Sequence, residues 1–467
     1  MEKKELSSLP DLVTIGGGDK LLAHNTATGM NGWLPASLLT RGGYAARRWN
    51  VNHASPKGEA YGDIDYLRDL PGLLGLGCYL VSPNREFRKL DPTDHHKLAT
   101  GEPAALDGTM GDYMWCWNTH YYAFWTEGEW YYEAVSLKPI PGRENYRVPR
   151  GGISALSGGV IDREKGTLCS VVSNEPRYRG GDNDASKDGA YNTLLGRIAT
   201  NIASSAFSAY ARKKGEGWEA GWFTHLAVVG YLFRVIFGTR DVQEDFSPDK
   251  DKDGLYQGGL GLGNGLSYAW WQPHFDQWPF MPTSAGVELA DACGRTTYAV
   301  TGNDGTVVAT VKIPCFFGLK SFYGSNLLME NGLLGVPDND HGYIYVARSW
   351  YDGANLYTTP NEKMVKAASY PLTNGTAQFI SKISMRNLCH FPTEIGATAS
   401  TGYADSLKTA NIGGPFVAQR TLDTSKGENC GLEATRLLST YQFVSKYATS
   451  PLCVTSEDVV PIPFLAD

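Results

Sequence analysis

The stretch that decides the fold is GEGWEAGWFTHLAVVGYLFRVIFGTRDVQ, residues 215–243. Its apolar residues recur at steps of three and four, which aligns them along one face of a helix. These residues are Trp218, Trp222, Leu226, Val229, Phe233 and Ile236. Gly221 and Gly230 lie within the pattern and weaken it, so tertiary packing must hold the helix together. We therefore predict a core helix that ends at Gly238, with its tryptophans buried and away from any ligand.

A second helix is expected directly before this one. Ser204 or Ser205 is a suitable N-terminal cap for a helix that runs to Lys214. Nearly everything else has the pattern of short strands, including two aromatic strands in residues 106–136 that meet at a turn with Gly128. The expected fold class is α+β: a β-rich domain with two consecutive core helices, preceded by a small N-terminal attachment region.

Three regions are expected along the chain. Residues 1–45 form an arm that is too small to bury its own core, so it is expected to attach to other proteins or to another copy of the chain. A strand lying on the main domain is an equal alternative for this arm. Residues 46–107 are polar and rich in turns and form an irregular connection, and residues 108–467 form the main domain.

The composition favours a recognition or structural role over nucleic-acid binding. The 467-residue chain has a formal net charge of -7, whereas nucleic-acid binding needs a clustered basic surface. Aromatic residues make up 12% of the chain and charged residues 19%. Tyrosine and tryptophan suit recognition surfaces, although they are also ordinary strand residues. No segment has the apolar length of a signal peptide or a membrane-spanning helix, so we expect no membrane insertion and folding in a cytosol.

No metal site and no cofactor are expected. The 8 cysteines are far apart and lack CxxC spacing, which favours reduced core residues. His95 and His96 follow a proline turn and are expected in a solvated loop. Asp249, Asp251 and Asp253 match the first half of a calcium-binding loop, but its twelfth position is leucine instead of glutamate. A solvated acidic turn is therefore the favoured interpretation.

No catalytic residue is proposed from the sequence. Glycan hydrolysis needs paired carboxylates, and the candidates are Glu127, Glu129, Glu133, Asp338, Asp340 and Asp352. No sequence pattern pairs any two of them. The sequence also lacks serine-hydrolase, metalloprotease, nucleotide-binding and cysteine-nucleophile signatures. We therefore expect a protein that is not an enzyme.

Several segments resemble a known family. LDGTMGDYMWCWNTHYY (residues 106–122) resembles the opening strand of phage tail-associated and diversity-generating-retroelement target proteins, which have a C-type-lectin-like or formylglycine-generating-enzyme-like fold. Residues 199–243 resemble the paired helices of that family. LYQGGLGLG (residues 255–263) and GENCGLEATRL (residues 427–437) are similar to later parts of such chains.

The N-terminal segments are similar to tail or head-fibre proteins of phages that infect Bacteroides-type gut bacteria. These segments are LVTIGGGDKLLAHN (residues 12–25) and YGDIDYLRDLPGLLGLGCYL (residues 61–80). The resemblance implies a virion protein, made in the host bacterial cytoplasm, that contacts other virion proteins through its arm and often forms a homotrimer. The C-terminus VVPIPFLAD lacks the GGR-type final strand of variable relatives, and no reactive cysteine pair is identifiable. Neither hypervariability nor enzyme activity is therefore carried over.

The resemblance also implies a ligand-binding face built by late loops and strands, for a host-surface glycan or protein. The matching polar and aromatic residues are Tyr403, Asp405, Lys408, Asn411, Arg420, Glu428 and Asn429. Tyrosine together with arginine and asparagine suits a polar or glycan ligand. The leading hypothesis is a non-enzymatic virion fibre protein that recognises the host surface. The alternatives are a purely architectural head-decoration or tail-connector protein and a depolymerase of host glycans.

Overall fold

The computed structural model describes most of the chain. It gives the backbone and side chains of residues 43–156, 158–173, 175–178, 198–266, 288–300, 306–350, 359–421, 430–445, 447–458 and 460–462, and the backbone of residues 20–25, 30–35 and 301. Among these residues, strands account for 43% and helices for 12%, with three α-helices. The fold is β-rich, with several antiparallel sheets. The predicted α+β class is therefore wrong.

Two antiparallel sheets are built mainly from the first third of the chain. The five-stranded sheet has the order β11-β9-β10-β3-β4. Its strands are β3 (Ala45–Asn50), β4 (Glu59–Gly62), β9 (His120–Glu127), β10 (Trp130–Ser136) and β11 (Tyr146–Val148). The seven-stranded sheet has the order β15-β28-β12-β8-β5-β6-β7. Its strands are β5 (Gly77–Val81), β6 (Phe87–Asp91), β7 (Asp94–Leu98), β8 (Asp112–Trp117), β12 (Gly151–Ser154), β15 (Trp218–Ala220) and β28 (Leu452–Thr455).

A nine-stranded sheet is formed by the C-terminal part of the chain. Eight strands follow the order β21-β20-β19-β25-β26-β24-β22-β23, and β27 pairs with β19. The end strands β21 and β23 contact each other, so this sheet is nearly closed into a barrel. Its strands are β19 (Leu327–Asp338), β20 (His341–Ala347), β21 (Met364–Pro371), β22 (Gln378–Ser384), β23 (Phe391–Ile395), β24 (Ser406–Thr409), β25 (Phe416–Arg420), β26 (Thr435–Ser439) and β27 (Ala448–Thr449).

The remaining elements are small. β13 (Val160–Asp162) and β14 (Thr167–Cys169) form one hairpin, and β16 (Gly294–Thr301), β17 (Val307–Phe316) and β18 (Leu319–Lys320) form a three-stranded sheet. The helices are α2 (Ile64–Leu73), α4 (Ser204–Arg212) and α5 (Phe223–Phe237), with 3-10 turns η2 (Pro176–Tyr178) and η4 (Arg386–Leu388).

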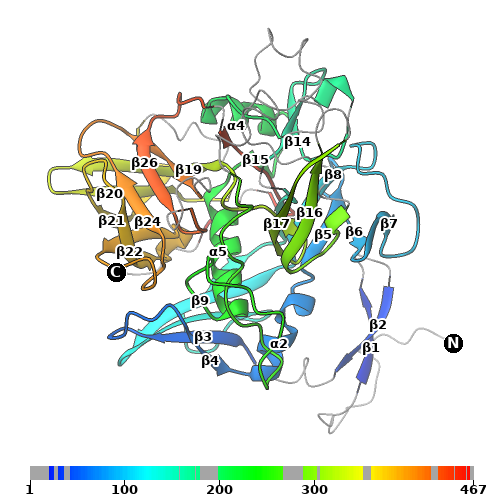
Figure 1. The fold of residues 1–467 in the computed structure, drawn as a ribbon, viewed down its shortest axis with the longest axis horizontal. Coiled ribbons are helices and arrows are strands. Elements are labelled where there is room, and N and C mark those ends of the chain that lie inside the picture. Colours follow the sequence, from blue (N-terminus) through cyan, green and yellow to red (C-terminus); the bar gives the residue numbers. More distant parts are fainter. Residues whose placement is uncertain are drawn as a thin grey trace.

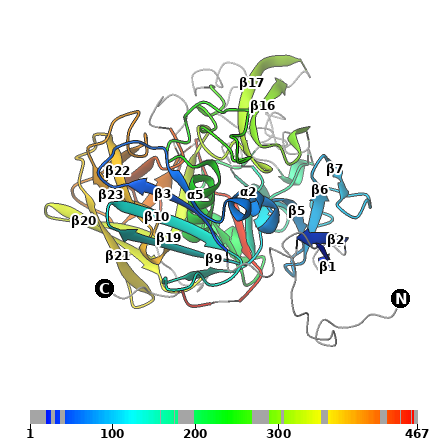
Figure 2. The ribbon, with the colours of Figure 1, turned by 90° about the horizontal axis from the view of Figure 1, so that it is seen from below.

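Helix α5 occupies the centre of the molecule. All its residues are buried, and it contacts β3, β10, β12, β19, α2 and η4. Figure 1 shows α5 between the barrel strands and the β16–β17 hairpin, with β3 and β9 below it. Figure 2 shows that β3 and β10, which are paired neighbours, pass near one end of this helix. The prediction of a core helix in this stretch is confirmed, because three sheets pack around it.

The helix begins later than its apolar periodicity predicts. Trp218 lies on the edge strand β15, and Trp222 is the N-cap residue of α5. Between them Gly221 has a φ of 53°, and a Cβ at this position would lie 2.0 Å from the carbonyl oxygen of Met329. The chain therefore turns at a position that accepts only glycine. Trp218, Trp222 and Phe233 are nevertheless buried, as predicted.

The second predicted core helix is short and only partly buried. Four of the nine residues of α4 are buried, and its N-cap is Ala203, which makes no side-chain capping bond. The expected serine cap is therefore wrong. Strand β15 separates α4 from α5, so the two helices do not form a consecutive core pair, and the predicted C-type-lectin-like arrangement is wrong.

Strands from the predicted connecting region share sheets with later strands. β3 pairs with β10, and β5 pairs with β8, both antiparallel. In the predicted arm, β1 (Lys20–Asn25) and β2 (Met30–Pro35) pair with each other as an antiparallel hairpin. The other residues of 1–42 lie outside the described part of the chain, and the attachment role stays a prediction.

Gly238 ends α5 as predicted, with a left-handed φ of 69°. Arg47 Nε donates to the carbonyl of Val235 in the last turn at 3.0 Å, and a Cβ on Gly238 would lie 2.7 Å from the guanidinium carbon of Arg47. We expect Gly238→Ala to lower the free energy of unfolding by about 1–2 kcal/mol from left-handed strain alone, and by more if Arg47 is displaced.

Gly128→Ala is the matched control for this prediction. Gly128 has a similar φ of 59°, but no atom lies within 4 Å of its added Cβ. Urea unfolding should show a smaller loss for Gly128→Ala than for Gly238→Ala. Equal losses would show that the contact with Arg47 has no energetic role.

Candidate functional site

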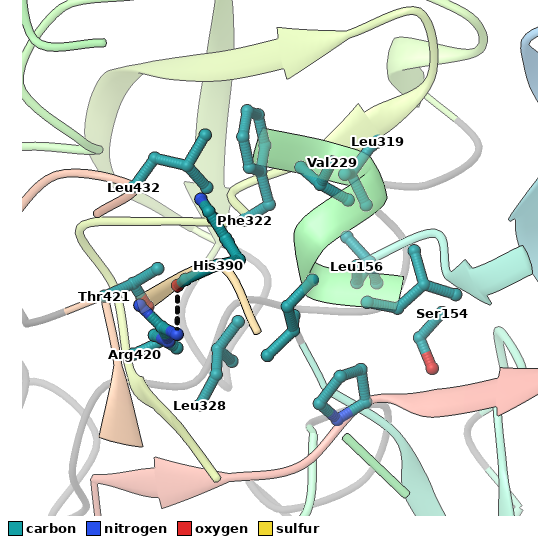
Figure 3. Close-up of a pocket in the computed structure, with 13 residues that line it drawn as sticks. Ser154, Leu156, Val229, Leu319, Phe322, Leu328, His390, Arg420, Thr421 and Leu432 are labelled. Atoms are coloured by element: carbon teal, nitrogen blue, oxygen red, sulfur yellow. Dashed lines mark hydrogen bonds between the residues drawn. The ribbon is translucent and has the colours of Figure 1, made fainter. Parts of the chain in front are cut away.

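A small internal cavity lies beside α5. Its volume is about 20 Å³, which is room for about one water molecule. Figure 3 shows Val229 of α5 with Leu156 and Leu319 on one side, and the Arg420–His390 contact with Leu328 beside it on the other. The lining residues are Ile153, Ser154, Leu156, Leu226, Val229, Leu319, Phe322, Leu328, His390, Arg420, Thr421, Leu432 and Pro451. This cavity is too small for a ligand and is a void in the core.

A buried charge cluster adjoins this void and links α5 to two sheets. Arg234 on α5 donates through Nε to both carboxylate oxygens of Glu133 on β10, each at 3.1 Å, and its Nη1 lies 2.5 Å from Glu433. His390 Nε2 lies 2.5 Å from the other oxygen of Glu433. Burial opposes ionisation of Glu433, but His390 and Arg234 outweigh it and lower its pKa to about 2. These contacts join the five-stranded sheet to the barrel.

Arg420 forms a second buried ion pair next to this cluster. Its Nε donates to Glu330 on β19 at 2.8 Å, and its Nη1 donates to Thr435 Oγ1 at 2.7 Å. Arg420 Nη2 also donates to the carbonyl oxygen of His390 at 2.5 Å. The guanidinium is 2% exposed, so a ligand in solvent does not reach it. Its role is to hold β25, β19 and β26 together.

A larger cavity opens between the five-stranded sheet and the barrel, and we name it the Arg240 groove. Its volume is about 540 Å³, within the range of small-molecule sites. One wall comes from the end of β3, the following loop, β9 and β10, and the other comes from β22, β23 and the loop before β24. The lining residues are Asn50, Val51, Asn52, His53, Ala54, Thr126, Tyr131, Arg240, Ser381, Lys382, Ile383, Glu394, Gly396, Ala397, Thr401, Gly402 and Tyr403.

Arg240 is surrounded by three aromatic rings. The guanidinium carbon lies 4.6 Å from the centre of the Trp49 ring, 5.4 Å from that of Tyr131 and 5.0 Å from that of Tyr403. The backbone N–H of Arg240, two residues after the α5 cap, donates to the carbonyl of Pro56 at 2.9 Å and fixes the chain. Stacking on rings orients a guanidinium while its edge remains available for hydrogen bonds.

The guanidinium of Arg240 has no acidic partner within the described residues. Its Nε is buried without a hydrogen-bond partner, and no carboxylate lies within 4.0 Å. The hydroxyl of Tyr131 is likewise buried without a partner. The other two charged lining residues neutralise each other, because Lys382 Nζ lies 2.9 Å from Glu394. The described lining of the groove therefore carries one uncompensated positive charge.

Tyr403 supplies a neutral hydroxyl beside this charge. Burial raises the pKa of Tyr403 to about 12, although Arg240 and Arg234 act in the opposite direction. The phenol is therefore protonated at neutral pH, and because Tyr403 is only 2% exposed, its role is to pack beside Arg240 and not to bind a ligand in solvent. Among the described members of the predicted ligand-binding set, Tyr403 alone lines the groove.

The other predicted binding residues have separate places. Asp405 is fully buried and accepts the backbone N–H groups of Gly431 and Glu433 at 2.9 and 2.8 Å, so it holds the loop before β26. Lys408 is half-buried on β24, and Asn411 is exposed and accepts the N–H of residue 374 at 2.8 Å. Arg420 is in the buried ion pair described above, and residues 428 and 429 lie outside the described part of the chain.

Sequence reasoning missed Trp49, Tyr131 and Arg240. These side chains lie on β3, on β10 and after α5, and no local motif links them. Arg240 follows the helix stop at Gly238, where an arginine is ordinary. The only available signal was general, namely the high aromatic content of the chain.

Among the described residues, Cys78, His95 and Asp291 form the one group of three potential metal ligands, with their atoms within 4.8 Å of one another. Lys320 Nζ lies 3.7 Å from Cys78 Sγ and donates to the Tyr113 hydroxyl at 2.8 Å. This buried ammonium would repel a metal cation. Burial also raises the pKa of Cys78 to about 12, whereas the thiolate is the metal-binding form. These residues therefore do not fit a metal ion.

The predicted solvated loop at His95 and His96 is wrong. Both residues lie on β7, where His96 is exposed and His95 is fully buried. His95 contacts the Tyr113 hydroxyl through Nδ1 at 2.8 Å and Asp291 through Nε2 at 3.1 Å. These partners come from other parts of the chain, so the local sequence does not reveal them. The polar residues around His95 and His96 alone indicated solvent exposure.

The acidic residues considered for calcium binding or catalysis have structural or solvated positions. Asp251 accepts the backbone N–H groups of residues 253 and 255, each at 2.9 Å, and thereby stabilises the acidic turn. Four of the catalytic candidates are exposed, namely Glu127, Glu129, Asp338 and Asp340. Glu133 is paired with Arg234, and residue 352 lies outside the described part of the chain.

All 8 cysteines lie in the described part of the chain and none forms a disulfide; seven are buried and Cys293 is half-buried. The prediction that they are core thiols is confirmed for the seven buried cysteines. Each helix in the described part of the chain is too short or too polar to cross a membrane.

No protein-family model matches the sequence, and no curated protein is significantly similar to it.

Proposed function

We propose that this protein is a non-enzymatic recognition protein whose Arg240 groove binds a saccharide of the host surface. In the proposed setting it is a tail or head-fibre component of a virion. The observation that carries the proposal is the guanidinium of Arg240, which three aromatic rings orient at the wall of an open cavity and which no carboxylate of the described residues neutralises. Oriented arginine and tyrosine side chains are typical of recognition surfaces.

The lining of the groove supports binding better than hydrolysis. A glycosidase uses two carboxyl groups on opposite sides of the scissile bond. The described lining contains one carboxylate, Glu394, and Lys382 pairs with it at the exposed rim. Amide and hydroxyl groups make up most of the other polar groups in the lining. Such groups suit a hydroxyl-rich ligand.

The proposed place in a virion rests on the resemblance of several segments to phage fibre proteins. In this proposal residues 1–45 contact other virion proteins, and a homotrimer presents several copies of the groove. Multiple copies raise the avidity for a repeating surface glycan even when each site binds weakly.

We expect the full-length protein to bind at least one member of an array of neutral and acidic oligosaccharides. Arg240→Met should weaken this binding roughly tenfold or more, because it removes charge-assisted hydrogen bonds. Arg143→Met is the matched control: Arg143 stacks on Trp125 at 4.2 Å but does not line the groove. Failure to bind any oligosaccharide, or equal weakening by both variants, would contradict the proposal.

A further inference from the structure

We infer that the saccharide bound in the Arg240 groove carries a carboxylate, and that Arg240 binds this group. The inference rests on the proposed function and specifies the chemical class of the ligand. It starts from the charges of the lining. Lys382 and Glu394 form a rim pair at 2.9 Å, which leaves Arg240 as the one unpaired charge among the described arginines, lysines and carboxylates of the groove.

The geometry around Arg240 favours a planar anion. The rings of Trp49, Tyr131 and Tyr403 surround the guanidinium at 4.6 to 5.4 Å from its carbon. An arginine held by rings presents its edge, and two parallel N–H groups on that edge match the two oxygens of a carboxylate. A single guanidinium also balances one negative charge, whereas a phosphate monoester carries up to two near neutral pH.

Groups near Arg240 provide sites for the sugar hydroxyls. The Tyr131 hydroxyl and Arg240 Nε are buried and lack partners, so they do not contact a ligand directly, and the polar side chains along the walls supply the hydroxyl sites. Farther along the walls, the side chains of Asn50 and Thr126 line one side and Thr401 lines the other. A carboxylate at Arg240 with hydroxyls along the walls corresponds to a sugar acid within an oligosaccharide.

The test compares sugar acids with their own methyl esters. The probes are oligogalacturonide, oligoglucuronide and sialyllactose, each as the free acid and as the methyl ester, together with a neutral galactose oligomer and a sulfated galactose oligomer. Titration calorimetry with the full-length protein measures each dissociation constant. We expect at least one acid to bind roughly tenfold or more tightly than its ester, because esterification removes the charge.

Variants assign the preference to Arg240. Arg240→Met should bind the acid and the ester equally, and Arg240→Lys should keep a reduced preference because it retains charge but not two parallel donors. Arg143→Met should retain the wild-type preference. Equal thermal unfolding midpoints for the wild type and Arg240→Lys show that the groove variant is folded, and hydrogen exchange locates the bound acid through protection of residues 50–54 and 396–403.

Each outcome separates the inference from the proposed function. Equal binding of acid and ester by the wild type, or stronger binding of the sulfated oligomer, overturns the carboxylate assignment but leaves saccharide recognition standing. An acid preference that survives in Arg240→Met overturns the role of Arg240. Binding of none of the saccharides overturns both the inference and the proposed function.

Discussion

Arg234→Met is expected to lower the free energy of unfolding by about 3–5 kcal/mol, because removal of one partner leaves buried charges uncompensated. Arg234 is fully buried, and its guanidinium contacts Glu133 at 3.1 Å and Glu433 at 2.5 Å. Methionine has a similar length but no donors. Both carboxylates would then remain inside the protein without their common cation.

The measurement is urea unfolding followed by tryptophan fluorescence. Arg68→Met is the matched control, because Arg68 pairs with Asp65 at 3.0 Å on the exposed side of α2. Exposed pairs contribute about 0–1 kcal/mol, so this variant should unfold close to the wild type. A loss in Arg234→Met no larger than that in Arg68→Met would show that the cluster does not stabilise the fold.

A second variant separates the charge from the packing. In Arg234→Met combined with Glu133→Gln and Glu433→Gln, no net charge of the trio remains in the core. Replacement of a whole buried ionic group by neutral residues is often tolerated better than removal of one member. We expect the triple variant to be more stable than Arg234→Met alone, and the opposite order would assign the loss to packing.

Local sequence patterns predicted those features that depend on neighbouring residues. The buried helix and its stop at Gly238 followed from apolar periodicity and from the conformational freedom of glycine, and the turn at Gly128 between β9 and β10 is confirmed. The error in the predicted start of the helix arose at Gly221. Helical spacing continues through Trp218 and Trp222, whereas the contact that bends the chain comes from Met329, far along the sequence.

Sheet pairing and the groove depend on residues that are distant in sequence. β12 pairs with β28, so Ile153 lies opposite Cys453, and no local pattern specifies this partner. The same reason explains why Arg240 was missed, because its aromatic neighbours lie on β3, on β10 and between β23 and β24. Tyr403 was selected by resemblance and composition, and its position in the groove depends on the same long-range pairing.

Acidification is expected to destabilise the protein between about pH 6.5 and pH 4. His120 and His225 are fully buried, and burial lowers the pKa of each from 6.5 to about 4. His225 Nε2 donates to the carbonyl of Val454 at 2.9 Å, and His120 Nδ1 lies 2.8 Å from the carbonyl oxygen of residue 118. Hydrogen bonding to these carbonyls opposes the shift in both cases, but loss of hydration dominates.

The sign follows from where each state takes up a proton. The unfolded imidazoles are protonated below about pH 6.5, whereas the folded ones stay neutral until about pH 4. The contribution of these two histidines to the free energy of unfolding is therefore fully present above about pH 6.5. It is lost as the pH decreases to 4, by about 3 kcal/mol for each histidine. Glu433 acts in a lower window, because its stabilising ionisation is lost only as the pH falls from 4.5 towards 2.

Histidine variants isolate this effect from carboxylates that titrate in the same range. Burial raises the pKa of Asp241 to about 6, so Asp241 favours the folded state on acidification and partly offsets the histidines in the wild type. His225→Gln should reduce the stability lost between pH 7 and pH 4.5 by about 2–3 kcal/mol, measured by urea unfolding at each pH. The exposed His96→Gln should leave the loss unchanged. An unchanged loss in His225→Gln would mean that this imidazole is hydrated or protonated in the folded protein, because only a neutral buried histidine couples unfolding to proton uptake in this window.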